Sequence, residues 1–293
     1  MTEASPIVPA GGPLELLFDA SGVPRVALPS ALAACYGGEL GFSAPCLYAN
    51  FVSSVDGVVA LRSAEESGGV ISGHSEADRF VMGLLRACAD AVLIGAGTFR
   101  KAASHLWHAE HVYPAAATHF ALLRRRLSLL PQPLLVIVSA SGELSVDHPA
   151  FQHPTLIVTT PRGKARLSRG LPPQVRFLVT EAAPIPFAPI LDALRGEQLG
   201  NVLSEGGPSL IGSLVREGLL DELFLTSSPV LLGRRDGDGR KTLVEGVDVL
   251  GRASARLELL SVRRHLSHLF LRYRALLDLR GPATAPAGTS KIG

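Results

Sequence analysis

The stretch that most constrains the fold of this chain is residues 201–233, NVLSEGGPSLIGSLVREGLLDELFLTSSPVLLG. A short apolar run opens it and is broken by the Glu-Gly-Gly at residues 205–207. Pro208 then stands where a first helical residue belongs, because its φ is already fixed near the helical value and its missing N–H has no intrahelical partner there. Apolar residues recur at helical spacing until Gly218 ends the helix, and a second apolar run starts at Leu223. The pattern predicts a strand, a glycine turn, a helix and a second buried strand.

The glycine turn within this stretch has the features of an anion site. Gly206 and Gly207 let the backbone approach a ligand closely, and the free N–H groups at the start of the following helix attract a phosphate. Two glycines also serve a tight strand-to-helix turn that binds nothing. This stretch alone leaves both interpretations open.

A second junction of strand and glycine lies at residues 91–98. The apolar run AVLI is followed directly by Gly95, Ala96, Gly97 and Thr98. Thr98 is placed to donate its hydroxyl to a phosphate or an amide, or to cap the next turn. Because a dinucleotide needs two loops flanking one cleft, the two junctions together favour a nucleotide site more than either does alone.

Short strands alternate with helices along most of the chain. Helices are predicted over residues 76–88, 115–129 and 186–194, and strands over 91–94, 134–139, 155–160, 175–179 and 201–204. The closing runs at 223–232, 256–263 and 269–274 have no long helices between them. Alternating strands and helices are typical of parallel sheets, and strands in direct succession of antiparallel ones. We expect an α/β domain whose mostly parallel central sheet carries antiparallel C-terminal strands at one edge.

Composition sets the expected domain boundaries. The chain has 293 residues, and its hydrophobic fraction of 47% is sufficient for a sizeable core. Residues 1–45 are rich in proline and glycine, which predicts an N-terminal extension that is ordered in part at most. Residues 46–280 are the predicted α/β domain, and residues 281–293 a disordered tail of Pro, Gly and Ala.

Polar side chains follow the first predicted strand of the domain, which begins at Leu47. Ser53, Ser54 and Asp56 lie at its carboxyl end, directly before Gly57. The carboxyl ends of parallel strands are where open α/β sheets bind ligands, so this group is a candidate for ligand binding. An Asp-Gly turn without any ligand is the alternative.

Three histidines, His105, His108 and His111, lie in the segment 100–114 at steps of three residues. On one helix, such steps drift away from a common face, and no carboxylate completes a metal site of known spacing. We expect no metal here, but a polar loop over the cleft in which Trp107 stacks or packs. A metal-dependent hydrolase built on the three histidines is the alternative.

Charge and cysteine content exclude several classes of protein. The formal net charge is +2, and the basic cluster Arg124–Arg126 is predicted to be a solvated helix end, so no nucleic-acid surface is expected. No apolar run approaches the roughly 18 residues of a membrane helix, and the N-terminus has neither the basic nor the apolar part of a signal peptide. Three widely spaced cysteines have neither a disulfide framework nor zinc-ligand spacing. We expect a cytoplasmic protein with reduced thiols.

Four motifs, taken in order, carry a family resemblance. They are NFVSSVDG at 50–57, GVISG at 69–73, LLRACADAVLIGAGT at 84–98 and VLSEGGPSLIGSLVREGLLDELFLTSSPVLLG at 202–233. Through them the chain from about Leu47 to Leu277 resembles the reductase domain of the bifunctional riboflavin-biosynthesis deaminase-reductase. The resemblance implies a dihydrofolate-reductase-like three-layer fold, a homodimer, and transfer of hydride from NADPH to a carbon of a flat heterocycle. The sequence contains no H-x-E…C-x-x-C deaminase signature, so a stand-alone reductase is implied.

The resemblance also implies roles for individual residues. The NADPH site is implied at the two glycine turns, in Gly95, Gly97, Thr98, Glu205, Gly206, Gly207 and Pro208. The pocket for a small heterocyclic substrate is implied at Asn50, Ser53, Ser54 and Asp56, with Arg86 helping to hold the substrate. Asp56 is the first candidate for the group that supplies a proton, Glu205 the second and solvent the third. For Glu205, the alternative is that it orients its own turn.

The segment 100–114 departs from the family pattern. The riboflavin reductases follow the glycine loop with an acidic A-D-D-P segment and an L-x-x-R run that binds phosphoribose, whereas this chain has RKAASHLWHAEHVYP. An arginine fork binds phosphate at two points, and His or Trp does not replace it. Three functions therefore stay open: reduction of the phosphoribosylamino-pyrimidine, reduction of dihydrofolate or another pteridine, and a nucleotide-binding relic without catalysis.

Overall fold

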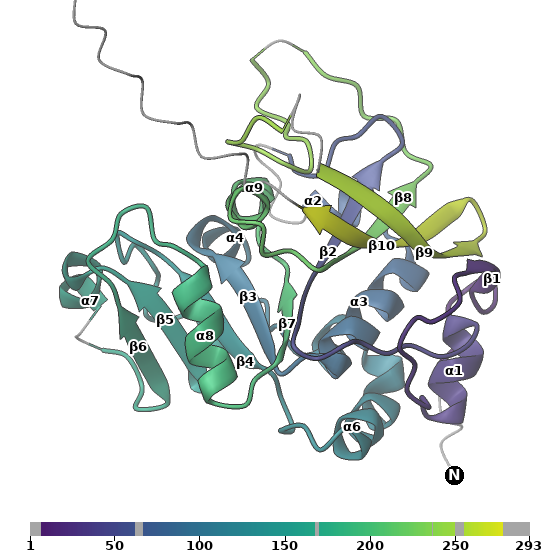
Figure 1. Cartoon of the computed structure of the whole chain (residues 1–293), viewed down its shortest axis with the longest axis horizontal. Helices are drawn as coiled ribbons and strands as arrows, with labels where there is room; N and C mark the ends of the chain where they lie inside the picture. The colour runs from purple at the N-terminus through teal and green to yellow at the C-terminus, as the bar shows by residue number, and fades with distance from the viewer. Residues whose placement is uncertain (1–6, 62–66, 168–169, 236, 250–254, 278–293) are drawn as a thin grey trace, which may run out of the picture.

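One continuous sheet organises the molecule. The computed structural model describes residues 7–61, 67–167, 170–235, 237–249 and 255–277. Within these ranges ten strands pair in the order β1-β9-β10-β8-β2-β7-β3-β4-β5-β6 (Figure 1). The strands are β1 (Glu15–Asp19), β2 (Cys46–Ser54), β3 (Ala91–Gly95), β4 (Leu134–Val138), β5 (Thr155–Thr159), β6 (Val175–Val179), β7 (Asn201–Ser204), β8 (Glu222–Ser228), β9 (Ala255–His265) and β10 (His268–Leu277).

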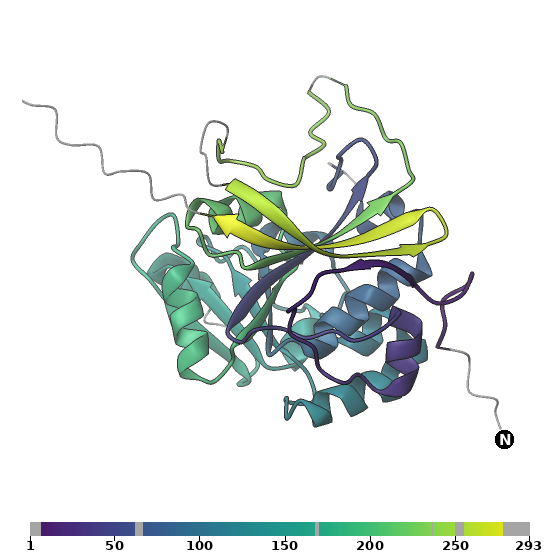
Figure 2. The same cartoon turned by 45° about the vertical axis from the view of Figure 1, so that its right-hand side comes forward.

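The sheet is parallel over most of its width and antiparallel at one edge. The strands from β8 through β2, β7, β3, β4 and β5 to β6 are all parallel neighbours. At the β8 side, β10, β9 and β1 continue the sheet in antiparallel pairs, and Figure 2 shows β9 and β10 as a long two-stranded hairpin in yellow. The predicted fold class, a mostly parallel sheet with antiparallel C-terminal strands, is confirmed. β8 ends at Ser228, earlier than the predicted 232, directly before Pro229, which has no N–H to donate to a ladder.

Helices cover both faces of the sheet and make it the middle of three layers. One face packs against α1 (Ser30–Tyr36), α3 (Glu76–Cys88), α5 (Ala109–Val112) and α6 (Ala117–Arg126). The other face packs against α8 (Ala188–Gly196) and α9 (Pro208–Arg216). The short helices α2 (Ser67–Ile71), α4 (Ala96–Lys101) and α7 (Pro161–Leu167) and the 3-10 turns η1 (Pro114–Ala116) and η2 (Pro149–Gln152) lie in the connections.

The apolar runs of the parallel strands are explained by burial on both faces. In β3, Val92 and Ile94 belong to the core under α3, whereas Ala91 and Leu93 belong to the core under α8 and α9. All four side chains are fully buried. A strand that is covered on both faces reads as a continuous hydrophobic run instead of an alternating one.

The N-terminal segment belongs to the fold from residue 7 onward. β1 pairs with β9, and α1 buries Leu32, Cys35 and Tyr36 in the same core as α3. The extension expected over residues 1–45 is therefore not separate from the α/β domain within its described part, because its partner strand comes from the far end of the chain. Residues 1–6 and the predicted tail at 281–293 lie outside the described residues.

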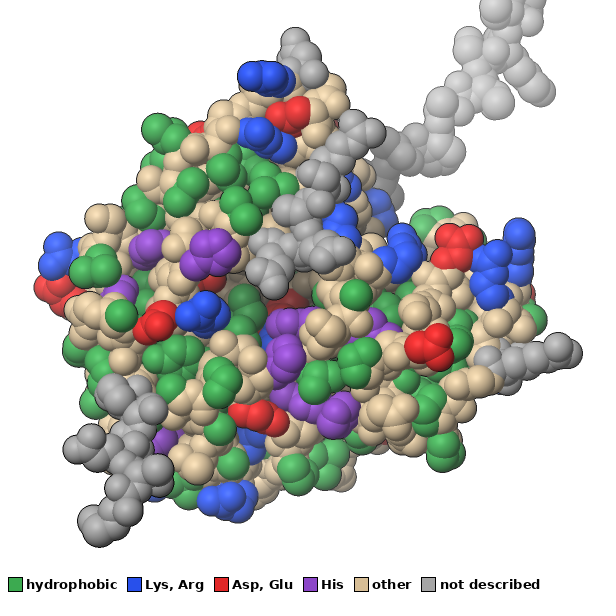
Figure 3. Space-filling view, turned by 180° about the vertical axis from the view of Figure 1, so that it is seen from behind, with side chains coloured by type: hydrophobic (Ala, Val, Ile, Leu, Met, Phe, Trp, Pro, Cys, Tyr) green, Lys and Arg blue, Asp and Glu red, His purple; other side chains and the backbone are tan. Residues whose placement is uncertain are grey.

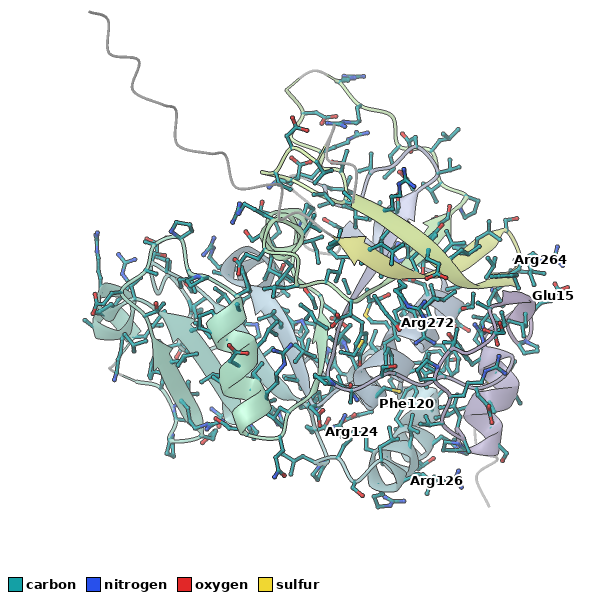
Figure 4. The ribbon with its side chains drawn as sticks, in the orientation of Figure 1. Glu15, Phe120, Arg124, Arg126, Arg264 and Arg272 are labelled. Atoms are coloured by element: carbon teal, nitrogen blue, oxygen red, sulfur yellow. The ribbon has the colours of Figure 1, made fainter. Side chains whose placement is uncertain are left out.

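Arg124 is buried, which differs from the solvated helix end predicted for residues 124–126. Its Nη1 donates to the carbonyl oxygens of Arg86 and Ala89, at 3.1 and 2.8 Å, and its Nε donates to Leu130 O at 2.7 Å. The side chain thus donates to carbonyls in the last turn and at the C-cap of α3, where the helix leaves acceptors open. Arg126 is exposed, and Figure 4 shows the two side chains on the same helix.

Candidate active site

A cavity of about 760 Å³ opens where the carboxyl ends of β2, β3 and β7 meet. Figure 3 shows histidine side chains gathered at one side of a hollow on this face of the molecule. The cavity is lined by nine of the residues implied by the resemblance: Asn50, Arg86, Gly95, Gly97, Thr98, Glu205, Gly206, Gly207 and Pro208. The other three residues implied at the site, Ser53, Ser54 and Asp56, do not line it.

The two glycine turns lie side by side because β3 and β7 are parallel neighbours. The Glu205 N–H donates to Leu93 O at 3.1 Å, which joins the turn after β7 to the last residues of β3. A Cβ built on Gly207 would lie 3.7 Å from Thr98 Oγ1, so the second turn faces the first across a short distance. The two glycine turns thus flank one cavity, as the sequence predicted.

Both helix starts at these turns present free backbone N–H groups. α4 begins after Gly95 and α9 after Gly207, and neither has a side-chain cap. Pro208 occupies the first turn of α9, as predicted. Uncapped helix starts bind anions, and the pair is suited to the phosphates of a dinucleotide.

Arg86, at the end of α3, has all five of its N–H donors engaged. Nε and Nη2 donate to the two carboxylate oxygens of Glu205, at 2.8 and 2.7 Å. Nη1 donates to Leu106 O and His108 O, both at 3.1 Å, and Nη2 also lies 2.9 Å from His105 Nε2. A guanidinium has five N–H groups and no more. Arg86 therefore ties the segment 105–108 to the turn after β7 and has no donor left for the substrate contact that the resemblance implies.

Glu205 is the partner of Arg86 and the anchor of its own turn. Both of its oxygens accept charge-assisted hydrogen bonds in a pair whose side chains are only 1% and 10% exposed. This arrangement matches the alternative expected for Glu205, that it orients the glycine turn. A carboxylate engaged in this way is poorly suited to supply a proton.

Ser53, Ser54 and Asp56 form a turn at the end of β2 instead of lining the cavity. Ser53 Oγ donates to Ser54 O, and Ser54 Oγ accepts from the Val58 N–H at 2.9 Å. Asp56 accepts from the backbone N–H groups of residues 232 and 233, at 3.2 and 2.7 Å. Hydrogen bonds from Ser54 and from that backbone lower the pKa of Asp56. Of the two interpretations of this group, ligand binding or an Asp-Gly turn, the contacts match the turn. Asp56 is therefore a poor candidate for the proton donor.

Asp78 is a second acid of the cavity lining, beside Glu205, and no sequence motif pointed to it. It lies in the first turn of α3, is 5% exposed and lines the cavity. Burial raises its pKa to about 6, although a hydrogen bond with the Thr226 side chain opposes the shift. A signal was available, because Asp78 precedes the inner-face residues Val81 and Leu85 by three and seven positions and so shares their helix face.

The three histidines of segment 100–114 do not gather around one point. His105 lies against His111, with ring centroids 4.8 Å apart, whereas His108 lies against His153 at 4.4 Å. Burial lowers the pKa of His105 to about 3 and that of His108 to about 4, so both are neutral at physiological pH. Across the described ranges, no three His, Cys, Asp or Glu side chains form a group that could hold a metal ion.

Trp107 packs into the core while bordering the cavity. It is 3% exposed, and its ring stacks on Phe99 of α4 with an interplanar angle of 13°. The predicted polar loop over the cleft is thus anchored through an apolar stack beneath it.

A model of the RibD C-terminal domain family matches residues 45–270 of the chain. The chain belongs to this family. The RibD C-terminal domain match runs from β2 to the first residues of β10 and includes both glycine turns and Asp78. The family predicted from the four motifs is confirmed.

Individual relatives agree with the assignment to the RibD C-terminal domain family. The chain is 23% identical over 221 residues to the 2,5-diamino-6-ribosylamino-4(3H)-pyrimidinone 5′-phosphate reductase of Archaeoglobus fulgidus, covering 72% of this chain and 96% of that one. It is 30% identical over 204 residues to the riboflavin biosynthesis protein RibD of Mycobacterium tuberculosis, covering 68% of this chain but 45% of the relative. The chain therefore corresponds to about half of the RibD protein.

A solved structure shares the fold. A pyrimidine reductase-like protein from Corynebacterium diphtheriae superposes with a TM-score of 0.64 at 22% identity, covering 80% of this chain and 93% of that chain. In the described residues, no helix is long and apolar enough to cross a membrane.

Proposed function

We propose that this protein is an NADPH-dependent reductase of a pyrimidine- or pteridine-like heterocycle. The observation that carries the proposal is one cavity that combines two facing glycine turns with a buried acid, Asp78. The reductase name of the Archaeoglobus relative, which the chain covers over 96% of its length, supports the reaction class. The intact cavity argues against a relic that has lost its chemistry.

The two turns are suited to the cofactor. A Cβ at Gly97 would meet no atom within 4 Å, so this backbone is open to a ligand, and Lys101 adds a cation to the same lining. The α9 start would hold phosphate oxygens through backbone N–H groups, with Thr98 facing it. When bound, NADPH would supply the hydride. The protein contributes alignment and exclusion of water.

Asp78 is the proposed source of the proton that must accompany the hydride. An acid with a pKa of about 6 is protonated in about a tenth of the molecules at pH 7, far more often than an ordinary aspartic acid, and it releases its proton readily. Its burial beside the cavity separates this proton from bulk solvent. We thus assign to Asp78 the role of proton donor for which the sequence had suggested Asp56.

The cationic lining supports a substrate that bears a phosphate. Arg79, Lys101 and Lys241 all line the cavity, although Lys101 Nζ also donates to Leu61 O at 3.0 Å. We propose 5-amino-6-(5-phosphoribosylamino)uracil, the deaminated intermediate of riboflavin biosynthesis, as the first substrate to test. The same cations suit the carboxylates of dihydrofolate, which is the second.

The test is NADPH oxidation by the purified full chain with each of the two substrates. Binding is measured first, by nicotinamide fluorescence with NADPH and with NADH. Micromolar binding that favours NADPH, followed by turnover with either heterocycle, is the expected outcome. Binding of neither dinucleotide would contradict the reductase function and would leave the glycine turns as plain architecture.

We further propose a cytoplasmic homodimer. The edge strand β1 exposes Leu16, Leu17 and Phe18, and its neighbour β9 exposes Leu257 and Leu259. An unpaired edge with exposed apolar side chains is a natural surface for a second copy. The described cysteines are free and buried, which suits a reducing compartment. Light scattering on the purified protein tests the dimer.

A further inference from the structure

The contacts of Arg86 define the protonation of His105. Nη2 of Arg86 lies 2.9 Å from His105 Nε2, and an arginine N–H can only donate. His105 Nε2 must therefore be the acceptor and carry no proton. Burial and the nearby Arg86 charge lower the pKa of His105 to about 3, which agrees with a neutral ring. A neutral imidazole without a proton on Nε2 has one on Nδ1.

The proton-bearing nitrogen of His105 has no hydrogen-bond acceptor within the described chain. The contacts of this ring are with Arg86, with Trp107 at a centroid distance of 5.2 Å and with His111 at 4.8 Å, both edge-to-face. His105 lines the cavity, and neither of its ring nitrogens is among the fully enclosed polar atoms that lack a partner. Its Nδ1–H is thus a fixed donor that a molecule in the cavity can reach.

We propose that His105 binds the heterocyclic substrate, donating a hydrogen bond from Nδ1 to a carbonyl oxygen or an unprotonated ring nitrogen. The proposal rests on the reductase function proposed above and deepens it by naming a residue that selects the substrate. Because Nε2 is held as the acceptor from Arg86, the ring cannot reverse its tautomer without losing that bond. His105 therefore favours a ring edge with an acceptor and disfavours one that presents an amino group.

The hydrogen bonds that link Glu205 to Arg86 and Arg86 to His105 explain why the Nδ1–H donor has a fixed position. Glu205 holds Arg86 at two points, Arg86 holds Nε2, and Nδ1 is left for the ligand. The same ion pair anchors the glycine turn proposed for the cofactor. In this chain, the histidine-containing segment 100–114, which departs from the family pattern, thus supplies a recognition group of its own.

Two substitutions separate substrate binding from the contact with Arg86. The side-chain amide of Asn reaches about the position of Nδ1, and that of Gln about the position of Nε2. His105→Gln keeps an acceptor for Arg86 and loses the donor to the substrate. His105→Asn keeps the donor and loses the contact with Arg86. His119→Gln, on α6 outside the cavity, is the control.

The measurement is steady-state NADPH oxidation with the deaminated riboflavin intermediate and with dihydrofolate, beside NADPH affinity by fluorescence. For His105→Gln we expect KM for the heterocycle to rise about tenfold, the loss of one hydrogen bond, with NADPH affinity within twofold of wild type. For His105→Asn we expect KM within about threefold of wild type, even if the protein melts at a lower temperature. An unchanged KM in His105→Gln, or an equal rise in both variants, overturns the proposal.

Imidazole-selective 1H–15N spectra of the full chain give a second readout. We expect the proton of His105 on Nδ1 and a shift of that signal when substrate is added to the protein with NADP⁺. A proton on Nε2, or a signal that substrate leaves unmoved, overturns the proposal. Wild-type protein that oxidises NADPH with neither substrate contradicts the proposed function itself, whereas wild-type turnover with unaffected His105→Gln contradicts only the role of His105.

Discussion

Arg86 and Glu205, 119 positions apart in the sequence, form a two-point ion pair inside the protein. The Nε–Oε1 and Nη2–Oε2 distances are 2.8 and 2.7 Å, and the two side chains are 1% and 10% exposed. The pair joins the C-terminal end of α3 to the glycine turn after β7. The ion pair therefore contacts both the glycine turn proposed for the cofactor and, through Arg86, the residue proposed to bind the substrate, His105.

Glu205→Gln should destabilise the fold strongly. The substitution preserves shape but leaves the Arg86 charge buried without a counter-charge, which costs about 3–5 kcal/mol in the free energy of unfolding. Urea denaturation measures the change. Glu197→Gln is the matched control, because its pair with Arg176 has side chains 45% and 51% exposed and should change stability by less than about 1 kcal/mol. Equal changes in the free energy of unfolding would show that the buried pair contributes no more to stability than the exposed one.

Asp78→Asn should abolish most of the activity and leave cofactor binding intact. Asn has the shape of Asp and can still accept a hydrogen bond, but it supplies no proton. We expect kcat to fall about 100-fold or more, the usual contribution of a general acid, with NADPH affinity within twofold. A variant that keeps wild-type kcat would show that the proton comes from elsewhere.

The pH dependence of stability should carry the signature of Asp78. Its folded pKa is raised from 3.8 to about 6, so between these values the folded protein binds more protons than the unfolded chain. Stability from this group is therefore fully present below about pH 4 and declines as pH rises to about 6, by about 3 kcal/mol in all. Denaturation curves at a series of pH values should show this decline in wild type, and Asp78→Asn should lack it and be more stable at pH 7. A pH profile that is the same in both proteins would contradict the raised pKa.

Two glycines in the turns should respond differently to alanine. A Cβ on Gly206 would lie 2.7 Å from Leu210 Cδ1, so Gly206→Ala should lower stability and distort the turn. A Cβ on Gly97 meets nothing within 4 Å, so Gly97→Ala should fold as wild type yet weaken NADPH binding about tenfold by blocking close approach. Gly196→Ala, also in open space but at the end of α8, is the control and should change neither property. Undiminished NADPH affinity in Gly97→Ala would place the cofactor elsewhere.

Asp56→Asn should leave catalysis nearly intact. The Asp56 carboxylate accepts from the backbone of residues 232 and 233, and its pKa is lowered by hydrogen bonds, so it serves the turn after β2. We expect kcat within about threefold of wild type and a modest loss of thermal stability, since one carboxylate oxygen is replaced by an amide nitrogen, which cannot accept a hydrogen bond. A loss of kcat as large as that of Asp78→Asn would restore Asp56 as the proton donor.

Local signals in the sequence determined the elements of this protein and located the two glycine turns that we propose bind the cofactor. Pro208 after two glycines defines a helix start through φ restrictions alone, and Ser75 caps α3 by accepting from the Asp78 N–H at 3.3 Å. The order of strands and helices then specified a mostly parallel sheet. These signals located both glycine turns at strand ends, whereas their meeting at one cavity depends on the pairing of β3 with β7, which lie more than 100 residues apart.

Only the tertiary structure decided which polar side chains face the cavity. β1 was missed because Glu15 pairs with Arg264 at the far end of the chain, and no local pattern encodes a partner so remote. Figure 4 shows the two side chains together at the sheet edge. Asp78 resembles an ordinary acid in a first helical turn until Thr226 and the core bury it. Arg86 resembles a free cation until five acceptors from four residues, 19 to 119 positions away, saturate it. Burial and hydrogen-bond saturation are sums over contacts from the whole chain, and these contacts exist only once the sheet has closed.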